Sequence, residues 1–400
     1  MTVLEELHRW LDANWNPSMP LRDWWRLLAD AGWSRPAWPS AWYGRDASPA
    51  EAAAIDDAIW DHGAVITPSG FGTNMAGPTL LIYGTDDQRR RHLPGIIYGT
   101  DAYCQLFSEP NAGSDLAGLQ TKAVRDGDDW VINGQKVWTS RGSIATKAIL
   151  LARTNADVVK QAGISFFILD MATPGVEVRP LKEMTGRSYF NEVFLTDVRI
   201  PATDLIGGEG NGWKVANTTL GFERSLSSGE HRESPEPGEK AGNLDRPAGP
   251  RVVHDAAHHD PSAPTEFETL LTLAHRLGRT TDPTIRQTLA RFYTLDRLNQ
   301  LTSARGADVA GLANLAKMAQ NHAVRLGREL TFSVLGANGL LFGYDDDAVA
   351  AANTTTGLSE LCDVIEVALW SPAPSIYGGS DQIQRNIVGE RVLGLPREPK

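Results

Sequence analysis

The sequence predicts a multi-domain α+β protein in which a helical segment, a β-rich segment and a second helical segment follow one another. Apolar residues recur at helical spacing over residues 1–102, short alternating runs between turn residues fill 103–208, and long amphipathic patterns return over 209–400. A chain of 400 residues has room for two or three domains, each with a core of its own.

The first segment is predicted to be helical from the spacing of its apolar residues. Leu4, Leu7 and Leu11 lie on one face of a helix, and Trp24 and Leu28 repeat that spacing further along. Tryptophan is dense here, and at such spacings it is more typical of core packing than of a platform on which bases stack. The net charge of -11 also argues against a nucleic-acid or anionic-membrane surface.

The middle segment has the pattern of short strands. In DWVINGQKVWTS, Asn133-Gly134 lies between two alternating runs, which predicts a β-hairpin turn at that dipeptide. The runs AILLAR, ISFFILDM, VEVRPL and NEVFLTDVRIP follow, each bounded by turn residues. This pattern predicts a small antiparallel barrel or sandwich.

The last segment predicts an antiparallel helical bundle with an insert. The insert, residues 229–265, holds six prolines and no aromatic residue, which predicts a disordered or loosely packed surface loop. Its deletion is therefore expected to leave activity largely intact. His254, His258 and His259 lie in it beside aspartates, but a solvated polar run is favoured over a metal site because no rigid element fixes the ligands.

The cysteines and the apolar runs indicate a cytoplasmic protein. Cys104 and Cys362 are far apart and lack metal-ligand spacing, as expected in a reducing compartment. The first residues show no secretory signal, and no stretch approaches the roughly 18 apolar residues that a membrane span needs.

Two motifs in the middle segment suggest a binding site. In QLFSEPNAGSDLAG, the residues Pro110 to Gly113 predict a tight turn whose amides can converge on an anion, and Ser114 adds a hydroxyl donor. A plain turn between two elements is the alternative for this motif taken alone. In GQKVWTS, Trp138 and Ser140 are expected on one face of a strand, because side chains alternate with a period of two.

Together with GGSDQIQRNIVGERVLGLPREP near the C-terminus, these motifs resemble the signature of the acyl-CoA dehydrogenases. The resemblance covers essentially the whole chain outside 229–265. It implies an N-terminal helical domain (1–102), a middle β-domain (103–208) and a C-terminal four-helix bundle (209–400), with FAD bound between the last two.

The resemblance also implies a set of site residues by motif match. The FAD-binding residues are Gln105, Phe107, Ser108, Ser114, Trp138, Ser140, Gly379, Ser380 and Gln382. Among them, Trp138 would shield the outer edge of the flavin, Ser140 would lie near N5, and Ser114 would reach a phosphate of FAD or of CoA. The substrate-binding residues are Ser114, Arg224 and Tyr377.

The stretch SIYGGSDQIQR raises the question of the catalytic base. The commonest form of this loop in the family carries the catalytic glutamate where this chain has Gly378. One branch, with the isovaleryl-CoA and long-chain dehydrogenases, instead carries it before an arginine in the first bundle helix, as in Phe222-Glu223-Arg224 here. The resemblance therefore implies that Glu223 removes the α-proton, that hydride passes to flavin N5, and that the N–H of Gly378 polarises the thioester.

Other carboxylates have simpler expected roles. An ordinary surface Glu–Arg pair is the alternative for Glu223, and the glycine at 378 makes it the less favoured one. Glu109 is the rival base, but in a turn full of amide donors it is expected to hold the loop, as is Asp115. Asp381 is expected to cap a helix.

Within the family, the chain resembles actinobacterial dehydrogenases, several of which act on CoA thioesters of steroid side chains and some of which are α2β2 heterotetramers. Family homotetramers carry Arg-x-x-Phe where this chain has Arg279 to Asp282, and Gln where it has Ser333. The resemblance thus implies a catalytic α-type chain that converts a steroid side-chain or other bulky acyl-CoA to the trans-2-enoyl-CoA. Its partners would be a homologous β-type chain and electron-transfer flavoprotein.

Four alternatives remain open. They are a homotetrameric dehydrogenase of fatty acyl-CoA, one that acts on an acyl-carrier-protein thioester, a flavin or nitroalkane-type oxidase with an aspartate base, and a catalytically inactive β-type chain. The pair of Glu223 and Gly378 argues against the last two.

Overall fold

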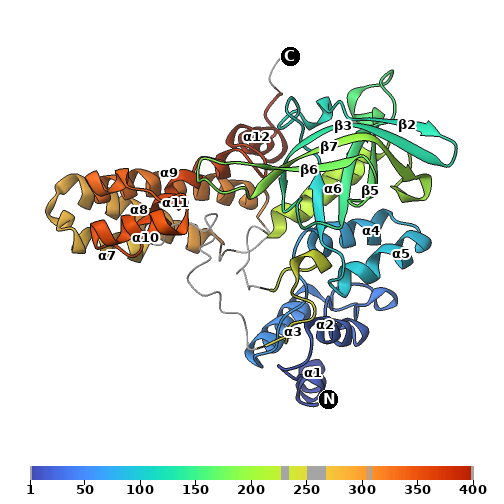
Figure 1. Cartoon of the computed structure of the whole chain (residues 1–400), viewed down its shortest axis with the longest axis horizontal. Coiled ribbons are helices and arrows are strands. Elements are labelled where there is room, and N and C mark those ends of the chain that lie inside the picture. Colours follow the sequence, from blue (N-terminus) through green and yellow to red (C-terminus); the bar gives the residue numbers. More distant parts are fainter. Residues whose placement is uncertain (1, 227–233, 250–266, 304, 306–308, 398–400) are drawn as a thin grey trace. The chain divides into compact units, whose positions relative to one another are not determined.

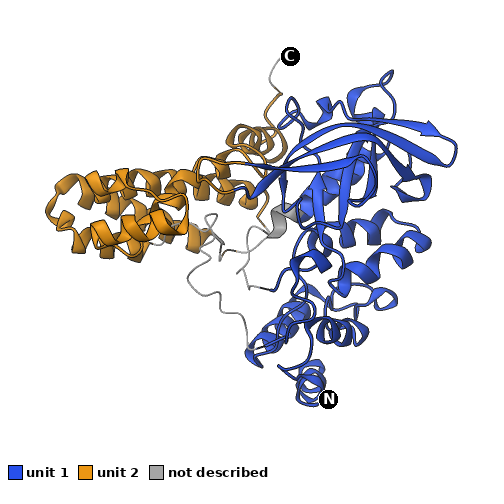
Figure 2. Ribbon diagram, in the orientation of Figure 1, with its two compact units in different colours: residues 1–181, 188–255 blue, residues 182–187, 256–400 orange. Residues whose placement is uncertain are grey.

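The computed structural model describes residues 2–226, 234–249, 267–303, 305 and 309–397 (Figure 1). The chain forms two compact units (Figure 2). Unit 1 comprises residues 1–181 and 188–255, and unit 2 comprises residues 182–187 and 256–400. The predicted order of helical, β-rich and helical segments is confirmed.

Unit 1 begins with helices whose starts follow from their capping residues. The helices are α1 (Val3–Asn14), α2 (Leu21–Asp30), α3 (Pro49–Asp61), α4 (Gly77–Tyr83) and α5 (Asp86–Ile97). Thr2, Ser48 and Thr85 each cap a helix in a reciprocal capping box, which satisfies backbone N–H groups of the first turn. α2 differs, because its N-cap is Pro20 and no side chain caps it.

The middle of unit 1 is an eight-stranded sheet in the order β6-β7-β3-β2-β4-β5-β8, with β1 paired to β4. Its strands are β1 (Tyr103–Leu106), β2 (Lys122–Asp126), β3 (Asp129–Ser140), β4 (Lys147–Arg153), β5 (Ile164–Asp170), β6 (Val176–Leu181), β7 (Phe190–Pro201) and β8 (Leu205–Ile206). The predicted antiparallel pairing is only partly right, since β1 and β4 are parallel. The long connection between these two strands makes a parallel pairing possible.

The hairpin turn predicted at Asn133-Gly134 is wrong. β3 runs through this dipeptide, and the turn lies at 127–128, where Gly127 has a φ of 62°. Asn133 donates to Asp197 Oδ1 of β7 at 3.0 Å, and a Cβ at Gly134 would lie 2.3 Å from Thr121 Oγ1. The dipeptide therefore lies where β3 shifts register against β7, and Gly134 leaves room for Thr121 to approach the strand. Glycine is typical of such positions inside a strand.

Helix α6 (Gly212–Leu226) follows the sheet and packs within unit 1. Val215 and Ala216 are buried in the same cluster as Phe166 of β5. The hydroxyls of Thr219 and Thr79 of α4 are 2.8 Å apart, so α6 is also bonded to the N-terminal helices.

Unit 2 is helical around a core of its own. Its helices are α7 (Phe267–Arg276), α8 (Pro283–Ser303), α9 (Leu312–Leu335), α10 (Asp346–Thr356), α11 (Leu361–Trp370) and α12 (Asp381–Ile387). Leucines of α7, α9 and α11 lie together in this core, as the amphipathic patterns predicted.

The prediction of a loosely packed insert is wrong for its described part, residues 234–249. Leu244 is 2% exposed and lies in a core cluster with the tryptophans of α2. The N–H groups of Leu21 and Arg22 donate to the carbonyls of Arg246 and Leu244 at 2.9 and 3.0 Å. The insert thus supplies acceptors for the first N–H groups of α2, which no side chain caps. Composition alone does not reveal that these groups need acceptors. The histidines His254, His258 and His259 lie outside the described residues.

This packing makes the insert part of the fold, so we no longer expect its deletion to be harmless. We expect Leu244→Ala to lower the free energy of unfolding by about 2–5 kcal/mol, because it removes a buried side chain and leaves a cavity. Urea unfolding followed by tryptophan fluorescence measures this loss. Leu340→Ala is the matched control, since Leu340 is 86% exposed. Equal stability of the two variants would mean that the insert is not part of the core.

Candidate active site

The predicted site residues fall into two groups, one in each unit. Unit 1 carries Gln105, Phe107, Ser108, Ser114, Trp138, Ser140, Glu223 and Arg224, and unit 2 carries Tyr377, Gly378, Gly379, Ser380 and Gln382.

A buried ion pair joins the two motifs of unit 1. Lys136 of β3 has no exposed surface and donates to Glu109 Oε1 at 2.8 Å and to the carbonyl of Phe107 at 3.1 Å. The carboxylate of Glu109 also accepts from the backbone N–H of Gln120 at 2.6 Å and of Thr121 at 2.9 Å. The segment that follows β1 is therefore fixed to β3 through charged and backbone groups.

The electrostatics of this pair follow from its burial. Burial lowers the pKa of the Lys136 ammonium to about 8, although the Glu109 carboxylate acts to raise it. Burial also opposes ionisation of Glu109, but the Lys136 ammonium and the hydrogen bonds from Thr121 and Gln120 hold its pKa below the ordinary value. Glu109 has its oxygens engaged by these donors, which fits the predicted role of holding the loop.

The role of Lys136 was missed in the sequence. Its signal was a lysine that continues, with a period of two, the buried positions of Trp130 and Ile132 in the same strand. Such a residue needs a buried acidic partner.

The turn in QLFSEPNAGSDLAG is present and tight. The N–H of Glu109 donates to the carbonyl of Ala112, and the N–H of Ala112 donates back, both at 3.0 Å. Gly113 and Ser114 follow on the surface, and a Cβ at Gly113 would meet no atom within 4 Å. Of the predicted anion donors, the N–H of Ala112 is thus used within the turn, whereas Gly113 and the hydroxyl-bearing Ser114 are exposed.

Trp138 occupies an irregular position at the end of β3. The pairing of β3 with β7 shifts register between Lys136 and Thr139, and Trp138 has a φ of 60°. Side chains therefore do not alternate regularly at this end of β3, so a shared face for Trp138 and Ser140 does not follow from the period of two. The indole is 58% exposed and its ring lies 5.7 Å from that of Phe190, edge to face. A large aromatic residue held at a positive φ is typical of a functional position.

The predicted FAD-binding residues of unit 1 have the polarity and exposure that suit the edge of a flavin. Gln105, Ser108 and Ser140 are half-buried and polar, and the exposed indole of Trp138 offers a flat apolar surface beside them. Val137 N–H donates to the carbonyl of Ser108 at 3.0 Å, which ties these positions together. The Thr139 hydroxyl is buried and has no hydrogen-bond partner among the described residues.

In unit 2, the loop before α12 is built on two glycines. Gly378 and Gly379 have φ values of 62° and 86°. The side-chain amide of Gln384 donates to both of their carbonyls, at 2.9 and 3.2 Å, and a Cβ at Gly379 would lie 2.7 Å from that amide. A glutamate at 378 would have space, but its backbone would be strained in this left-handed conformation.

Asp381 does not cap α12, contrary to the prediction. Ser380 is the N-cap and accepts from the N–H of Ile383. Asp381 instead accepts from Arg325 at 2.8 Å and from Asn321 at 2.6 Å, both on α9. Arg325 also donates to Ser375 Oγ at 2.6 Å, so one arginine holds both ends of the loop. The carboxylate of Asp381 pairs with this arginine and does not cap the helix, because a charge-assisted hydrogen bond to a guanidinium is strong.

Other predicted residues are placed only by their elements. Glu223 and Arg224 lie in α6, one helical turn after Thr219, and their side chains are outside what the structure describes. Gln382 is exposed on α12. The ammonium of Lys317 lies 4.5 Å from the ring centre of Tyr377, beside Gly378. The roles of these residues stay predictions.

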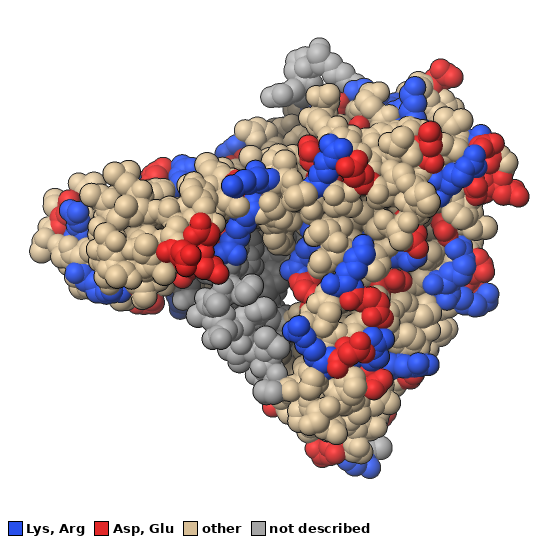
Figure 3. Space-filling view, in the orientation of Figure 1, with Lys and Arg blue, Asp and Glu red and all other residues tan. Residues whose placement is uncertain are grey.

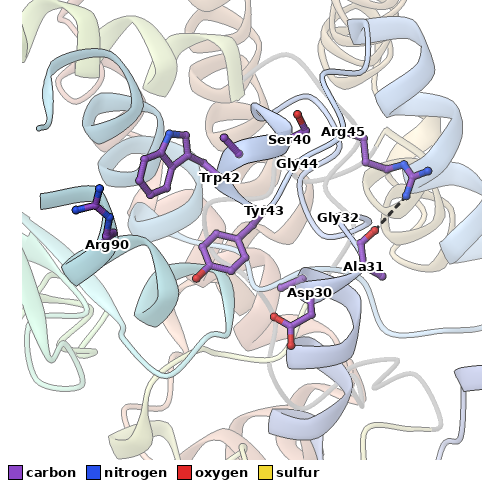
Figure 4. A pocket seen from close by; sticks show the side chains of 11 residues that line it. Asp30, Ala31, Gly32, Ser40, Trp42, Tyr43, Gly44, Arg45 and Arg90 are labelled. Atoms are coloured by element: carbon purple, nitrogen blue, oxygen red, sulfur yellow. Dashed lines mark hydrogen bonds between the residues drawn. The ribbon is translucent and has the colours of Figure 1, made fainter. Parts of the chain in front are cut away.

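A cavity of about 620 Å³ lies in the N-terminal helices (Figure 4). Asp30, Trp42, Tyr43, Arg45 and Arg90 contribute to its lining, and none of them is a predicted site residue. Arg45 donates to the carbonyl of Ala31, as the dashed line in Figure 4 shows, and Asp30 accepts from a tyrosine hydroxyl. These polar groups already have partners within the fold.

No group of three or more His, Cys, Asp or Glu that could hold a metal occurs among the described residues. In that same part of the chain, no helix is both long enough and apolar enough to cross a membrane. Basic and acidic side chains are interspersed on the face in view in Figure 3.

Family models match most of unit 1. The model of the acyl-CoA dehydrogenase N-terminal domain matches residues 2–100, and that of the acyl-CoA dehydrogenase middle domain matches residues 104–198. Acyl-CoA dehydrogenase IpdE1 of Mycobacterium tuberculosis is 37% identical over 384 residues, covering 95% of this chain and 89% of that protein.

Solved structures are similar over the whole chain. The ChsE4-ChsE5 complex from Mycobacterium tuberculosis gives a TM-score of 0.64 at 26% identity, covering 100% of both chains. The Tcur3481-Tcur3483 steroid ACAD gives a TM-score of 0.68 at 25% identity, covering 99% of this chain and 97% of the other.

We expect Lys136→Met to lower the free energy of unfolding by about 3–5 kcal/mol, because it leaves the Glu109 carboxylate buried without its counter-charge. The double variant Lys136→Met/Glu109→Gln should recover part of this loss. Urea unfolding at neutral pH measures both. Lys122→Met, on an exposed position of β2, is the control and should stay within about 0.5 kcal/mol of the parent protein. A double variant less stable than Lys136→Met would contradict the pairing.

Proposed function

We propose that this chain, which belongs to the acyl-CoA dehydrogenase family, dehydrogenates a bulky acyl-CoA thioester between its α and β carbons. As a member of that family it is a flavin-dependent oxidoreductase. We propose FAD as the flavin, with Gln105, Phe107, Ser108, Trp138 and Ser140 along its ring. Ser114, Gly379, Ser380 and Gln382 are proposed as further contacts, with Ser114 on a phosphate.

The observation that carries the proposal is the conformation of the glycine loop. Gly378 occupies the position where the family most often has its base, and its φ of 62° disfavours any other residue there. Glu109 is engaged by Lys136 and by two backbone N–H groups, so it is a poor base. Both observations support Glu223 on α6, the position that the family resemblance implies, as the proposed base.

The reaction divides between the chain and its cofactor. The bound flavin supplies an acceptor for the hydride that leaves the β-carbon. Glu223 takes the α-proton onto its carboxylate, so that two C–H bonds break and a trans double bond forms between the two carbons. The N–H of Gly378 donates to the thioester carbonyl oxygen and makes the α-carbon more acidic.

We propose a steroid side chain, or a similarly bulky group, as the acyl part. Support comes from the similar solved structure described as a steroid ACAD, which shares this fold over nearly its full length. Arg224 and Tyr377 are proposed to contact the substrate with Ser114.

We further propose that a homologous β-type chain completes the assembly. Asp282 stands where family homotetramers have phenylalanine, and its carboxylate accepts from the N–H of Thr284 at 2.8 Å at the start of α8. Ser333 donates to the carbonyl of Glu329 in its own helix at 2.7 Å. Both positions thus serve local structure in unit 2. Two similar solved structures bear paired names, ChsE4-ChsE5 and Tcur3481-Tcur3483.

Two expectations rest on the family and on the cysteines. Electron-transfer flavoprotein is proposed as the electron acceptor. A cytoplasmic location is proposed because Cys104 and Cys362 are both buried and unpaired with each other.

We expect Glu223→Gln to slow reduction of the flavin by an acyl-CoA by about 10²–10⁴-fold, because the α-proton then lacks a base. Flavin content should stay normal. Anaerobic stopped-flow absorbance measures the rate, and Glu209→Gln, an exposed position ahead of α6, is the control. Near-normal reduction by Glu223→Gln would remove this residue from the mechanism.

We expect the chain expressed alone to be colourless and to become yellow on co-expression with its β-type partner, since the partner would complete the flavin site. The visible spectrum and the mass of each purified sample measure this. A yellow tetramer of this chain alone, bleached by an acyl-CoA, would establish the homotetramer instead.

A further inference from the structure

The first part of the described insert, residues 236–240, lies against two segments of unit 1 that flank the candidate flavin strands. Glu236 forms an ion pair with Arg141, directly after Ser140 of β3. Lys240 donates to the carbonyl of Ala145 at 3.1 Å. The N–H of Gly238 donates to the carbonyl of Gly99, ahead of β1, at 2.8 Å. One short segment therefore contacts the chain on both sides of the site.

The two flanking segments are also bonded to each other. Thr146, before β4, donates through its N–H to the carbonyl of Ala102 at 2.8 Å and through its hydroxyl to Asp101 at 3.1 Å. β1, which follows Ala102, carries Gln105, and the end of β3 carries Trp138. A segment that fixes this junction acts on both strands.

The fit of the insert at this junction is close. Gly238 has a φ of 96°, and a Cβ there would lie 2.6 Å from the Cβ of Ala102. Only glycine allows the chain to pass at this distance in this conformation. Arg141 itself has a φ of 58°, so the backbone that leads out of the site is in an unfavoured conformation that needs support.

The far end of the insert supplies the anchor. Leu244 and Ala248 are buried among the N-terminal helices, and Asp245 pairs with Arg22 of α2 at 2.6 Å. Arg22 also pairs with Glu239 at 3.3 Å, so it links the anchor to the segment 236–240. The ion pair of Glu236 and Arg141 does not include Arg22, so it can be altered without removing the anchor.

We propose that residues 236–240 brace the end of β3, and that Glu236 is a positioning residue for Trp138 and Ser140. The segment touches neither substrate nor cofactor in this role. It limits the motion of the 138–146 stretch and so strengthens flavin binding. The flavin part of this inference rests on the proposed function, whereas the bracing of the stretch does not.

The test is a charge reversal measured by amide hydrogen exchange on the purified chain. Glu236→Arg and Arg141→Glu each place like charges together, and we expect each to speed exchange of amides 138–146 by about two- to fivefold, the range for a half-exposed ion pair. The double variant restores opposite charges and should return exchange close to that of the parent. Asp245→Asn, which removes an ion pair at the anchor, should leave these amides unchanged.

Flavin retention is the second measurement. With the flavin-loaded protein, or its complex with the partner chain, the single reversals should weaken flavin binding by a similar factor, and the double variant should restore it. Unchanged exchange in both single variants, or no rescue in the double, would overturn the brace. A parent protein that binds flavin but is not bleached by any acyl-CoA would overturn the proposed function and leave the exchange result valid.

Discussion

The buried ion pair of Lys136 and Glu109 is the constraint on which the candidate site of unit 1 depends. A lysine with no exposed surface is costly unless a partner and hydrogen bonds compensate its charge. The partner here comes from the segment after β1, and the carbonyl of Phe107 and the amides of Gln120 and Thr121 complete the network. The need to satisfy these groups together fixes the segment after β1, which carries Ser108, against β3, which carries Trp138 and Ser140.

A second constraint acts on the chemistry through backbone conformation. The loop before α12 turns through two left-handed glycines and is held by Gln384 and by Arg325 of α9. The left-handed backbone at Gly378 would strain any side chain there, although there is space for one. In the proposed mechanism, the N–H of Gly378 in this loop therefore polarises the thioester, and the base is Glu223 of α6.

The sequence predicted the order of the segments well, because helical and strand periodicities depend on nearby residues and extend over long stretches. The prediction failed where contacts with distant parts of the chain overrode a local preference. Asn133-Gly134 has turn preference, but pairing with β7 and the approach of Thr121 keep it inside β3. The insert looked unstructured by composition, yet the uncapped start of α2 recruits its carbonyls. Lys136 was overlooked because a single inward charge reveals its role only when its partner is known. The approach of Glu223 to a substrate stays a proposal.

The most direct test of the central claim is anaerobic mixing of the purified flavin-loaded protein with a CoA thioester of a steroid side chain, followed by mass and NMR analysis of the thioester. The account predicts that the flavin is bleached and that the product is the trans-2-enoyl-CoA, lighter by two hydrogens. A flavin that stays oxidised with this thioester and with straight-chain and branched acyl-CoA alike would contradict it.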